Sequence, residues 1–209
     1  TVTNLRETTA RIDDGVDESK RSTLKRFAAL GAATPLVHLS QSDASDVRDA
    51  IIGYLAATPG AHFSKLRDDL KLGTGETQHH LRRLERDGAI EHRKDGEYKR
   101  YFPAGRFSDF EQRALGYLRR ETPRKLLIAL LRDPESSGSE IADLAGVSRS
   151  TISKSAAELE SAELLSRADG YAIQRPETLL TLIVRYANSF DGDAVAFAGE
   201  ADEFVRYSP

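Results

Sequence analysis

The chain has 209 residues, of which 39% are hydrophobic and 30% are charged, and its formal net charge is −3. This composition is typical of a soluble globular protein with room for two small cores. It excludes a protein that binds nucleic acid through a large overall positive charge. Because the chain has no cysteine, disulfides, thiolate metal sites and cysteine nucleophiles are excluded as well. It has no run of about 18 apolar residues, so we expect no membrane span.

Residues 1–43 are expected to form a partly flexible leader ahead of the first domain. Within it, the basic pair Lys20-Arg21, then Leu24-Lys25 and a weakly apolar run over residues 27–39 resemble a twin-arginine export signal. Lys20 stands where that signal has its first arginine, and Thr23 stands where it has phenylalanine. The alternative, which we favour, is an amphipathic or flexible leader that has no role in export.

The next segment, residues 44–106, is expected to begin with two short helices. The first can be capped by Ser45 or Asp46, and it ends at Thr58-Pro59-Gly60. Its apolar residues recur at the spacing of one buried helical face. The second helix covers residues 63–72 and ends before a glycine-containing break.

A third helix, over residues 76–88, and a β-hairpin complete this segment. The helix ends at a glycine. Asp95-Gly96 lies between two alternating runs, which is a strong hairpin signal. Three helices followed by a basic hairpin are the plan of a winged helix-turn-helix domain, and the agreement among the elements supports it.

Residues 107–175 repeat this plan without repeating the sequence. A long helix is expected over residues 109–131, and a short one capped by Ser139 follows it. A turn and a third helix capped by Ser148 come next, and Asp169-Gly170 marks the tip of a second hairpin. The short helix is expected to bury Ile141, Leu144 and Ala145, and the third helix to bury Ile152, Ala156 and Leu159.

Two stretches carry a resemblance to known regulators. Ala142 and Gly146 stand four residues apart, with Ile152 six residues further on, which resembles the helix-turn-helix signature of many bacterial and archaeal regulators. Residues 77–102, TQHHLRRLERDGAIEHRKDGEYKRYF, resemble the recognition helix and wing of ArsR-like, MarR-like and TrmB-like regulators. The chain is therefore similar to archaeal, haloarchaeal-type tandem winged helix-turn-helix transcriptional regulators. The expected fold is mainly α, with small β-wings and flanking helices.

The resemblance implies double-stranded DNA as the partner. A recognition helix presents its polar side chains to base edges in the major groove, and basic wings contact phosphates. In the first unit the implied DNA-binding residues are Thr74, Glu76, Gln78, His79, Arg82, Arg83 and Arg86 on the helix, and Arg93, Lys94, Lys99 and Arg100 on the wing. In the second unit they are Ser148, Arg149, Ser150, Ser153, Lys154 and Arg167.

The charge is divided unequally between the two units. Residues 77–106 hold eight Lys and Arg against five Asp and Glu, whereas residues 107–209 hold twelve against seventeen. We therefore expect the first unit to supply most of the attraction to phosphates, with binding that weakens steeply as salt rises.

The last segment, residues 176–209, is expected to be helical, with Pro176 at its start. Its apolar residues cover more than one face, so this segment and the helix at 109–131 are candidates for homodimer contacts. The alternative is packing within the chain. The acidic end of the segment is a candidate for docking back on the domain or for sensing an unknown small effector.

Other function classes have less support. The adjacent histidines His79 and His80 point in different directions on a helix, and His92 lies on the wing, so no metal site is predicted, and no cofactor is expected. No phosphate loop, GxSxG or HExxH motif is present, so we expect no enzyme activity. The main alternative is a tandem winged-helix module that binds other proteins, as in chromosome-segregation accessory proteins, without sequence-specific DNA binding. A regulator of this kind is expected in the cytoplasm.

Overall fold

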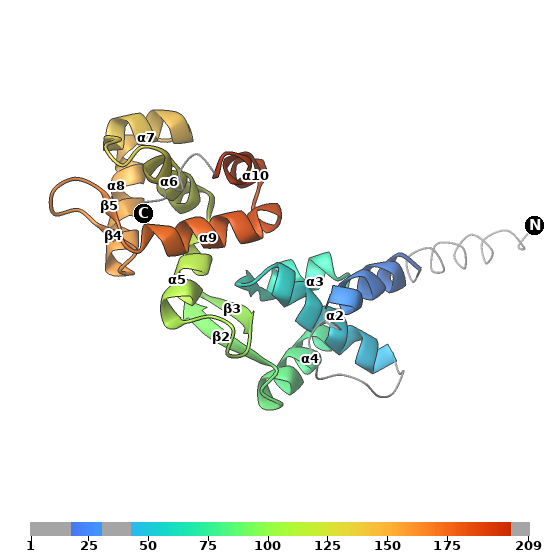
Figure 1. Cartoon of the computed structure of the whole chain (residues 1–209). Helices are drawn as coiled ribbons and strands as arrows, with labels where there is room; N and C mark the ends of the chain where they lie inside the picture. The colour runs from blue at the N-terminus through green and yellow to red at the C-terminus, as the bar shows by residue number, and fades with distance from the viewer. Residues whose placement is uncertain (1–17, 31–42, 202–209) are drawn as a thin grey trace, which may run out of the picture. The chain divides into compact units, whose positions relative to one another are not determined.

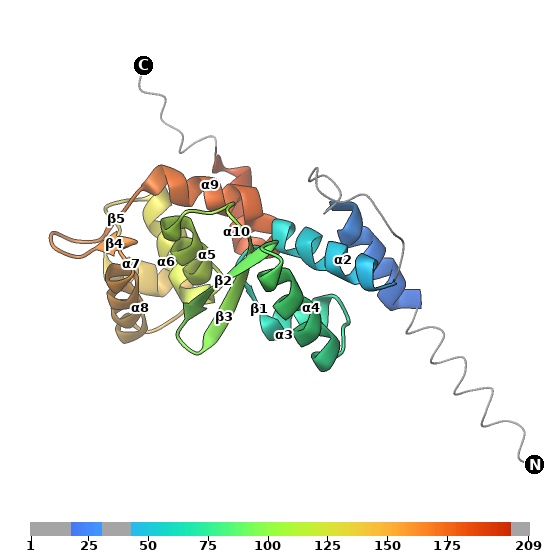
Figure 2. The ribbon, with the colours of Figure 1, turned by 90° about the horizontal axis from the view of Figure 1, so that it is seen from below.

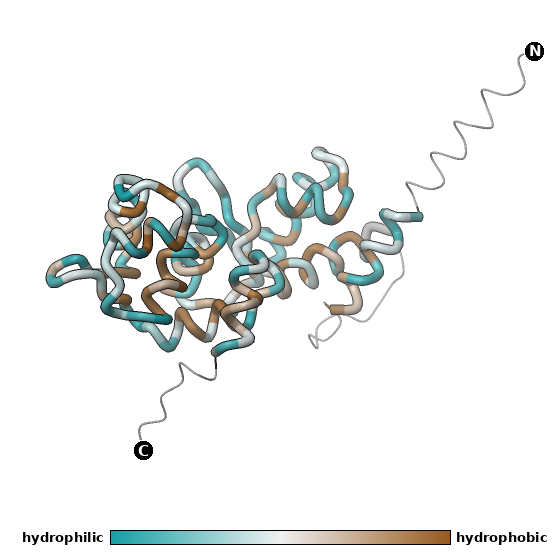
Figure 3. Tube along the Cα trace, turned by 90° about the horizontal axis from the view of Figure 1, so that it is seen from above, coloured by the Kyte–Doolittle hydropathy of each residue, from teal (hydrophilic) through white to brown (hydrophobic). Residues whose placement is uncertain are grey.

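The chain divides after Arg106 into two units, Thr1–Arg106 and Phe107–Pro209. The computed structural model describes residues 18–30 and 43–201. Figure 1 colours the first unit from blue to green and the second from green to red. Along the Cα trace in Figure 3, hydrophobic positions recur between hydrophilic ones, which is the pattern of helices with one buried face.

Within residues 43–106 of the first unit, three helices precede a hairpin, and together they form a winged helix-turn-helix. The helices are α2 (Asp43–Ala57), α3 (Phe63–Asp69) and α4 (Thr74–Arg86). The strands are β1 (Ala61–His62), β2 (Ile90–Asp95) and β3 (Tyr98–Pro103), and they form an antiparallel sheet in the order β1-β3-β2. The fold class expected from the sequence is thus confirmed in this unit.

The hairpin between β2 and β3 is the wing of this unit. Asp95 pairs with Tyr98, so Gly96 and Glu97 form a two-residue turn, one residue later than the predicted Asp95-Gly96. Gly96 has a φ of +60°, which a residue with a side chain rarely adopts. The strand β1 was not predicted, because two residues are too few to show an alternating pattern.

The boundaries of two helices differ from the prediction. Helix α2 begins at Asp43, so neither Ser45 nor Asp46 is at its N-cap position. Helix α4 begins two residues earlier than expected, because Gly73 is its N-cap and donates its backbone N–H to the Glu76 carboxylate (3.1 Å).

A helix over residues 18–30 packs against the first unit. Leu24 is buried in the same core as Tyr54 and Leu55 of α2. The ring of Phe27 meets the ring of Tyr54 edge to face, with 5.3 Å between centroids. Figures 1 and 2 show this helix, in blue, alongside α2. Part of the expected leader is therefore a packed helix, whereas residues 1–17 and 31–42 lie outside the described residues.

The second unit repeats the winged plan and adds helices at its C-terminal end. Its winged part comprises α5 (Asp109–Leu118), α6 (Glu121–Arg132), α7 (Gly138–Ala145), α8 (Arg149–Ser161) and the strands β4 (Leu165–Ser166) and β5 (Ala172–Ile173). Helix α9 (Pro176–Tyr186), the 3-10 turn η1 (Ala187–Ser189) and α10 (Gly192–Gly199) follow.

The long helix predicted over residues 109–131 is wrong, because the chain breaks between α5 and α6. Arg120 is extended, with φ −98° and ψ 133°. The break follows from Pro123, which has no backbone N–H to donate to the carbonyl of Arg119 and whose ring would clash with that carbonyl in a continuous helix.

Two predictions for α7 are also wrong. Its cap is Ser137, not Ser139, since the Ser137 hydroxyl accepts the Glu140 N–H (3.3 Å) and the Glu140 carboxylate accepts the Ser137 N–H (2.7 Å). Leu144 is 74% exposed, whereas Ala142 is buried in its place. A small residue at 142 lets α7 and α8 approach closely.

The C-terminal helices pack on their own unit. Leu179, Leu182, Ile183 and Tyr186 of α9 are buried, as are Ala194 and Phe197 of α10. The apolar faces that suggested a homodimer are thus largely covered within the chain.

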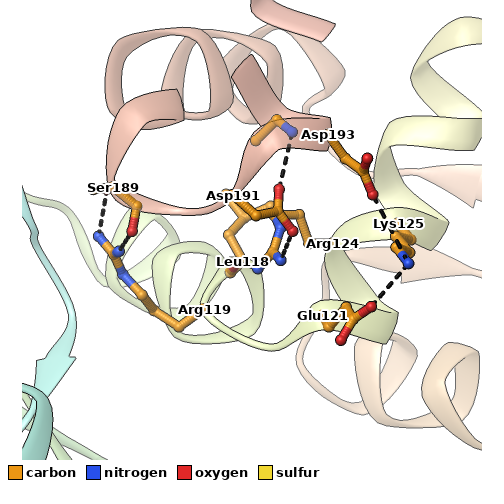
Figure 4. A network of polar contacts seen from close by, with 9 residues as sticks. Leu118, Arg119, Glu121, Arg124, Lys125, Ser189, Asp191 and Asp193 are labelled. Carbon is orange, nitrogen blue, oxygen red and sulfur yellow. Dashed lines mark hydrogen bonds and ion pairs between the residues drawn. The ribbon is translucent and has the colours of Figure 1, made fainter. Parts of the chain in front are cut away.

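A polar network fastens the C-terminal segment to the junction of α5 and α6 (Figure 4). Arg124 forms an ion pair with Asp191 and donates to the carbonyl of Leu118 (2.7 Å). Arg119 donates to the carbonyl and the hydroxyl of Ser189 (2.6 and 3.0 Å). Asp191 also caps α10, so one carboxylate both starts that helix and holds it in place.

Candidate nucleic-acid interface

Helix α4 presents a polar, cationic face to solvent. Its buried residues are Thr77, His80, Leu81 and Leu84, which lie on one side. The exposed side carries Thr74, Gln78, His79, Arg82, Arg83 and Arg86. Within the described part of the chain, Arg82 and Arg86 have no ion-pair partner, and Arg83 has a long contact with the exposed Asp87 (3.7 Å). These cations remain available to an external anion.

The wing adds cations that differ in their exposure to solvent and in their pairing with carboxylates. Lys94 is exposed and has no ion-pair partner among the described residues, and Lys99 is exposed with a carboxylate of Glu85 at 3.9 Å. Arg93 is half-buried. Arg100 is only 4% exposed, because it pairs with Asp95 and donates to the carbonyl of Gly60 (3.2 Å). The assignment of Arg100 to DNA is therefore wrong, and its role is to join β3 to the chain before β1.

Glu76 is likewise occupied within the protein. Its carboxylate caps α4 and accepts two hydrogen bonds from Lys20 of the helix at 18–30 (3.1 and 2.9 Å). Burial alone raises the pKa of Glu76, but the bonds from Lys20 and from the Gly73 N–H outweigh it and hold the pKa below its ordinary value. Glu76 therefore stays ionised and is not free to contact a base.

A side chain of the wing lies close to α4. Nδ1 of His92, on β2, is 2.6 Å from Oε1 of Glu85, which is on α4, but this oxygen has no hydrogen-bond partner among the described residues.

The two neighbouring histidines of α4 have different surroundings. His79 is exposed and His80 is buried, and their rings are nearly perpendicular, with centroids 5.3 Å apart. Burial lowers the pKa of His80, and the adjacent His79 acts in the same direction. Among the described residues, no group of three or more His, Cys, Asp or Glu side chains is placed to hold a metal ion.

In the second unit, α8 is the counterpart of α4 and is less basic. Ser148 caps it, accepting the Thr151 N–H (3.2 Å), so its hydroxyl is partly used. Arg149 donates to the Ser139 hydroxyl, and Lys154 is exposed without an ion-pair partner in the described part of the chain. Ser150 and Ser153 are exposed as well, whereas Arg167, at the wing, pairs with Glu160 (2.7 Å).

Sequence reasoning missed two features of this surface. Tyr98 is 54% exposed beside the turn of the first wing, with its ring 5.3 Å from the ring of His62. The alternating pattern of β3 could have indicated an outward aromatic residue there. The cations of residues 18–30 were assigned to a leader, whereas the packing of Leu24 and Phe27 and the bonds from Lys20 to Glu76 place them on the first unit.

Within the described residues, no helix is long and apolar enough to cross a membrane. Comparison with known proteins agrees with the fold. A family model described as an N-terminal HTH domain matches residues 45–115, and a model of winged helix-turn-helix DNA-binding domains matches residues 119–166. An uncharacterized HTH-type transcriptional regulator of Methanocaldococcus jannaschii is 32% identical over 90 residues, which are 43% of this chain and 22% of that protein. No solved structure matches the chain. The chain therefore contains two winged helix-turn-helix units, each similar to a family of helix-turn-helix domains, and over part of its length it is similar to an archaeal HTH-type transcriptional regulator.

Proposed function

We propose that the protein is a transcriptional regulator that binds double-stranded DNA mainly through its first unit. The observation that carries this proposal is the exposed face of α4, where Arg82 and Arg86 have no ion-pair partner among the described residues. A helix of this shape fits the major groove. The similar regulator from Methanocaldococcus jannaschii supports the same function class.

In this proposal, the residues divide into base-reading and phosphate-binding sets. Gln78, His79 and Arg82 read base edges, because they lie in the N-terminal and middle turns of the exposed face. Lys94 and Lys99 of the wing hold phosphates. The second unit reads an adjacent half-site with a smaller set: Arg149, Ser150, Ser153 and Lys154.

A pair of variants tests this division on DNA sites that the wild-type protein selects from a random pool. Arg82→Ala is expected to relax base preference and to cost about 1–3 kcal/mol on the preferred site. Lys94→Ala is expected to weaken binding to all DNA sequences alike. It should also lower the salt slope, which is the steepness with which log affinity falls with log salt concentration, by about 1. Lys65→Ala is the control, because Lys65 is already paired with Asp69 (2.7 Å). Wild-type binding by both test variants would refute the proposal.

A protein-binding module is the second candidate function, and the acidic second unit favours it. Residues 107–209 carry twelve Lys and Arg against seventeen Asp and Glu, so the net charge of this unit disfavours contact with phosphates. This candidate predicts that reversing the charge at Arg82 and Arg83 leaves function intact in cells. Loss of promoter occupancy in that variant would exclude it.

Dimerisation and effector binding are secondary parts of the proposal. A homodimer would match a two-fold symmetric operator, and the mass of the protein in solution at micromolar concentration tests whether it forms.

For a small effector, the second unit has a concavity of about 410 Å³ lined by Phe110, Arg113, Gln174 and Arg175, among others. Binding to chromosomal DNA would place the protein in the cytoplasm.

A further inference from the structure

The helix at residues 18–30 carries more positive charge than its packing requires. It has four cations, Lys20, Arg21, Lys25 and Arg26, against the single carboxylate of Glu18. Leu24 and Phe27 provide the apolar contact with α2, and Lys20 lies on the same side of the helix. Arg21, Lys25 and Arg26 are exposed.

Two contacts place the start of this helix beside the start of α4. Lys71, in the turn before α4, donates to the hydroxyl of Ser19. Lys20 donates to both carboxylate oxygens of Glu76, in the first turn of α4. The basic segment that resembled an export signal is thus held against the element that reads DNA in the proposed function.

Lys20 also removes an electrostatic obstacle. A carboxylate at Glu76, near the base-reading residues, would repel the phosphates that flank a major groove. Because the ammonium group of Lys20 lies 2.9 Å from that carboxylate, the pair presents no net charge to DNA.

We propose that the helix at residues 18–30 is a phosphate-binding element of the DNA interface. Lys25 and Arg26 contact the DNA backbone beside α4, and Lys20 acts as a positioning residue that neutralises Glu76. This inference rests on the proposed function of the first unit and adds to it a surface outside the winged core.

The first test removes the exposed cations. Lys25→Ala with Arg26→Ala is expected to weaken binding to every DNA sequence at least several-fold at physiological salt, and to lower the salt slope by about 1 to 2. Lys25 and Arg26 are consecutive and therefore point about 100° apart around the helix axis, so the single variants show which of the two contacts DNA. Arg132→Ala with Arg185→Ala is the control for overall charge, because it removes two exposed cations from the second unit, although Arg132 is paired with Glu200 (2.9 Å).

The second test addresses Lys20. Lys20→Gln leaves the Glu76 carboxylate uncompensated and is expected to weaken binding several-fold. Lys20→Arg keeps the charge and should retain affinity, and adding Glu76→Gln to Lys20→Gln should restore it, since glutamine can still cap α4. A purely structural role for Lys20 predicts no rescue by Glu76→Gln.

The outcomes separate this inference from the proposed function. If Arg82→Ala loses base preference while the Lys25 and Arg26 double variant and Lys20→Gln both bind as the wild type does, the inference is overturned and the proposed function stands. If Arg82→Ala and Lys94→Ala also bind as the wild type does, the proposed function itself fails. A loss in the Arg132 and Arg185 double variant equal to that in the test variant would assign the effect to overall charge and would also overturn the inference.

Discussion

At the scale of single residues, the sequence pattern predicts a helix more reliably than it predicts which of the helix's side chains are buried. Residues 141, 142, 144 and 145 contain two sets with helical spacing, one that buries Leu144 and one that buries Ala142. Hydrophobicity favours Leu144, but the structure buries Ala142 and leaves Leu144 exposed. The choice depends on how closely α8 approaches, which no local pattern contains.

His80 is a second residue whose role depends on burial. It lies on the recognition helix but faces the core, and burial lowers its pKa below the ordinary value of 6.5. The unfolded chain therefore takes up a proton at a higher pH than the folded chain does. The free energy of unfolding must then fall as the pH drops below about 6.5.

This linkage predicts a pH-dependent difference between the wild type and His80→Leu. Between pH 7 and pH 5, the urea midpoint of the wild type is expected to fall more than that of His80→Leu, which has no proton to take up at this site. His62, whose pKa is also lowered mainly by burial, contributes equally to both proteins. Parallel pH profiles for the two proteins would contradict a buried, neutral His80.

At the scale of elements, the wing shows where sequence reasoning succeeds and where it stops. The hairpin was predictable because Asp95-Gly96 sits between alternating runs. Its cations were predictable as a group, but the burial of Arg100 was not. That burial requires β1, a two-residue strand, and the carbonyl of Gly60, which lies forty residues earlier in the chain.

The wing therefore contains adjacent cations with opposite roles. Arg100→Ala removes a buried guanidinium that pairs with Asp95 and donates to the carbonyl of Gly60, and it is expected to cost about 3 kcal/mol of folding free energy. Lys99→Ala removes a side chain that is 52% exposed. The free energy of unfolding of this variant should therefore stay within about 0.5 kcal/mol of the wild-type value. Denaturant titration measures both, and DNA titration should show the Lys99 variant binding more weakly. Equal stabilities for the two variants would contradict the assignment.

The break between α5 and α6 is a different case, because its signal was present. Pro123 lies inside the segment predicted as one helix, and proline in a helix interior removes a hydrogen bond. The apolar periodicity on both sides obscured that signal. Helix α9, by contrast, was predicted from Pro176 at its start, where proline is favourable.

At the scale of the whole molecule, the order of elements in both units followed from turn residues and hydrophobic spacing. The packing of residues 18–30 did not follow, because a basic pair before an apolar run fits an export signal as well as an amphipathic helix. The packing of Leu24 and Phe27 on α2 and the bonds from Lys20 to Glu76 are contacts with distant residues, which no local pattern contains.

Division of the chain into two units predicts two unfolding events. Each unit has its own core, with Leu66 fully buried in the first and Leu115 in the second. Leu66→Ala and Leu115→Ala are each expected to cost about 2–5 kcal/mol. In calorimetry, each should lower the temperature of one transition and leave the other in place. A single transition that shifts equally in both variants would show that the units unfold together.

Because the helix at residues 18–30 packs on the first unit, the folded unit has different limits from the segment that the family model matches. The segment shared with the N-terminal HTH family begins at residue 45 and ends at residue 115. A fragment cut at those limits would lack Leu24 and Phe27, leaving one side of Tyr54 bare, and it would end inside α5. A fragment designed to fold on its own should instead begin before residue 18 and end at residue 106.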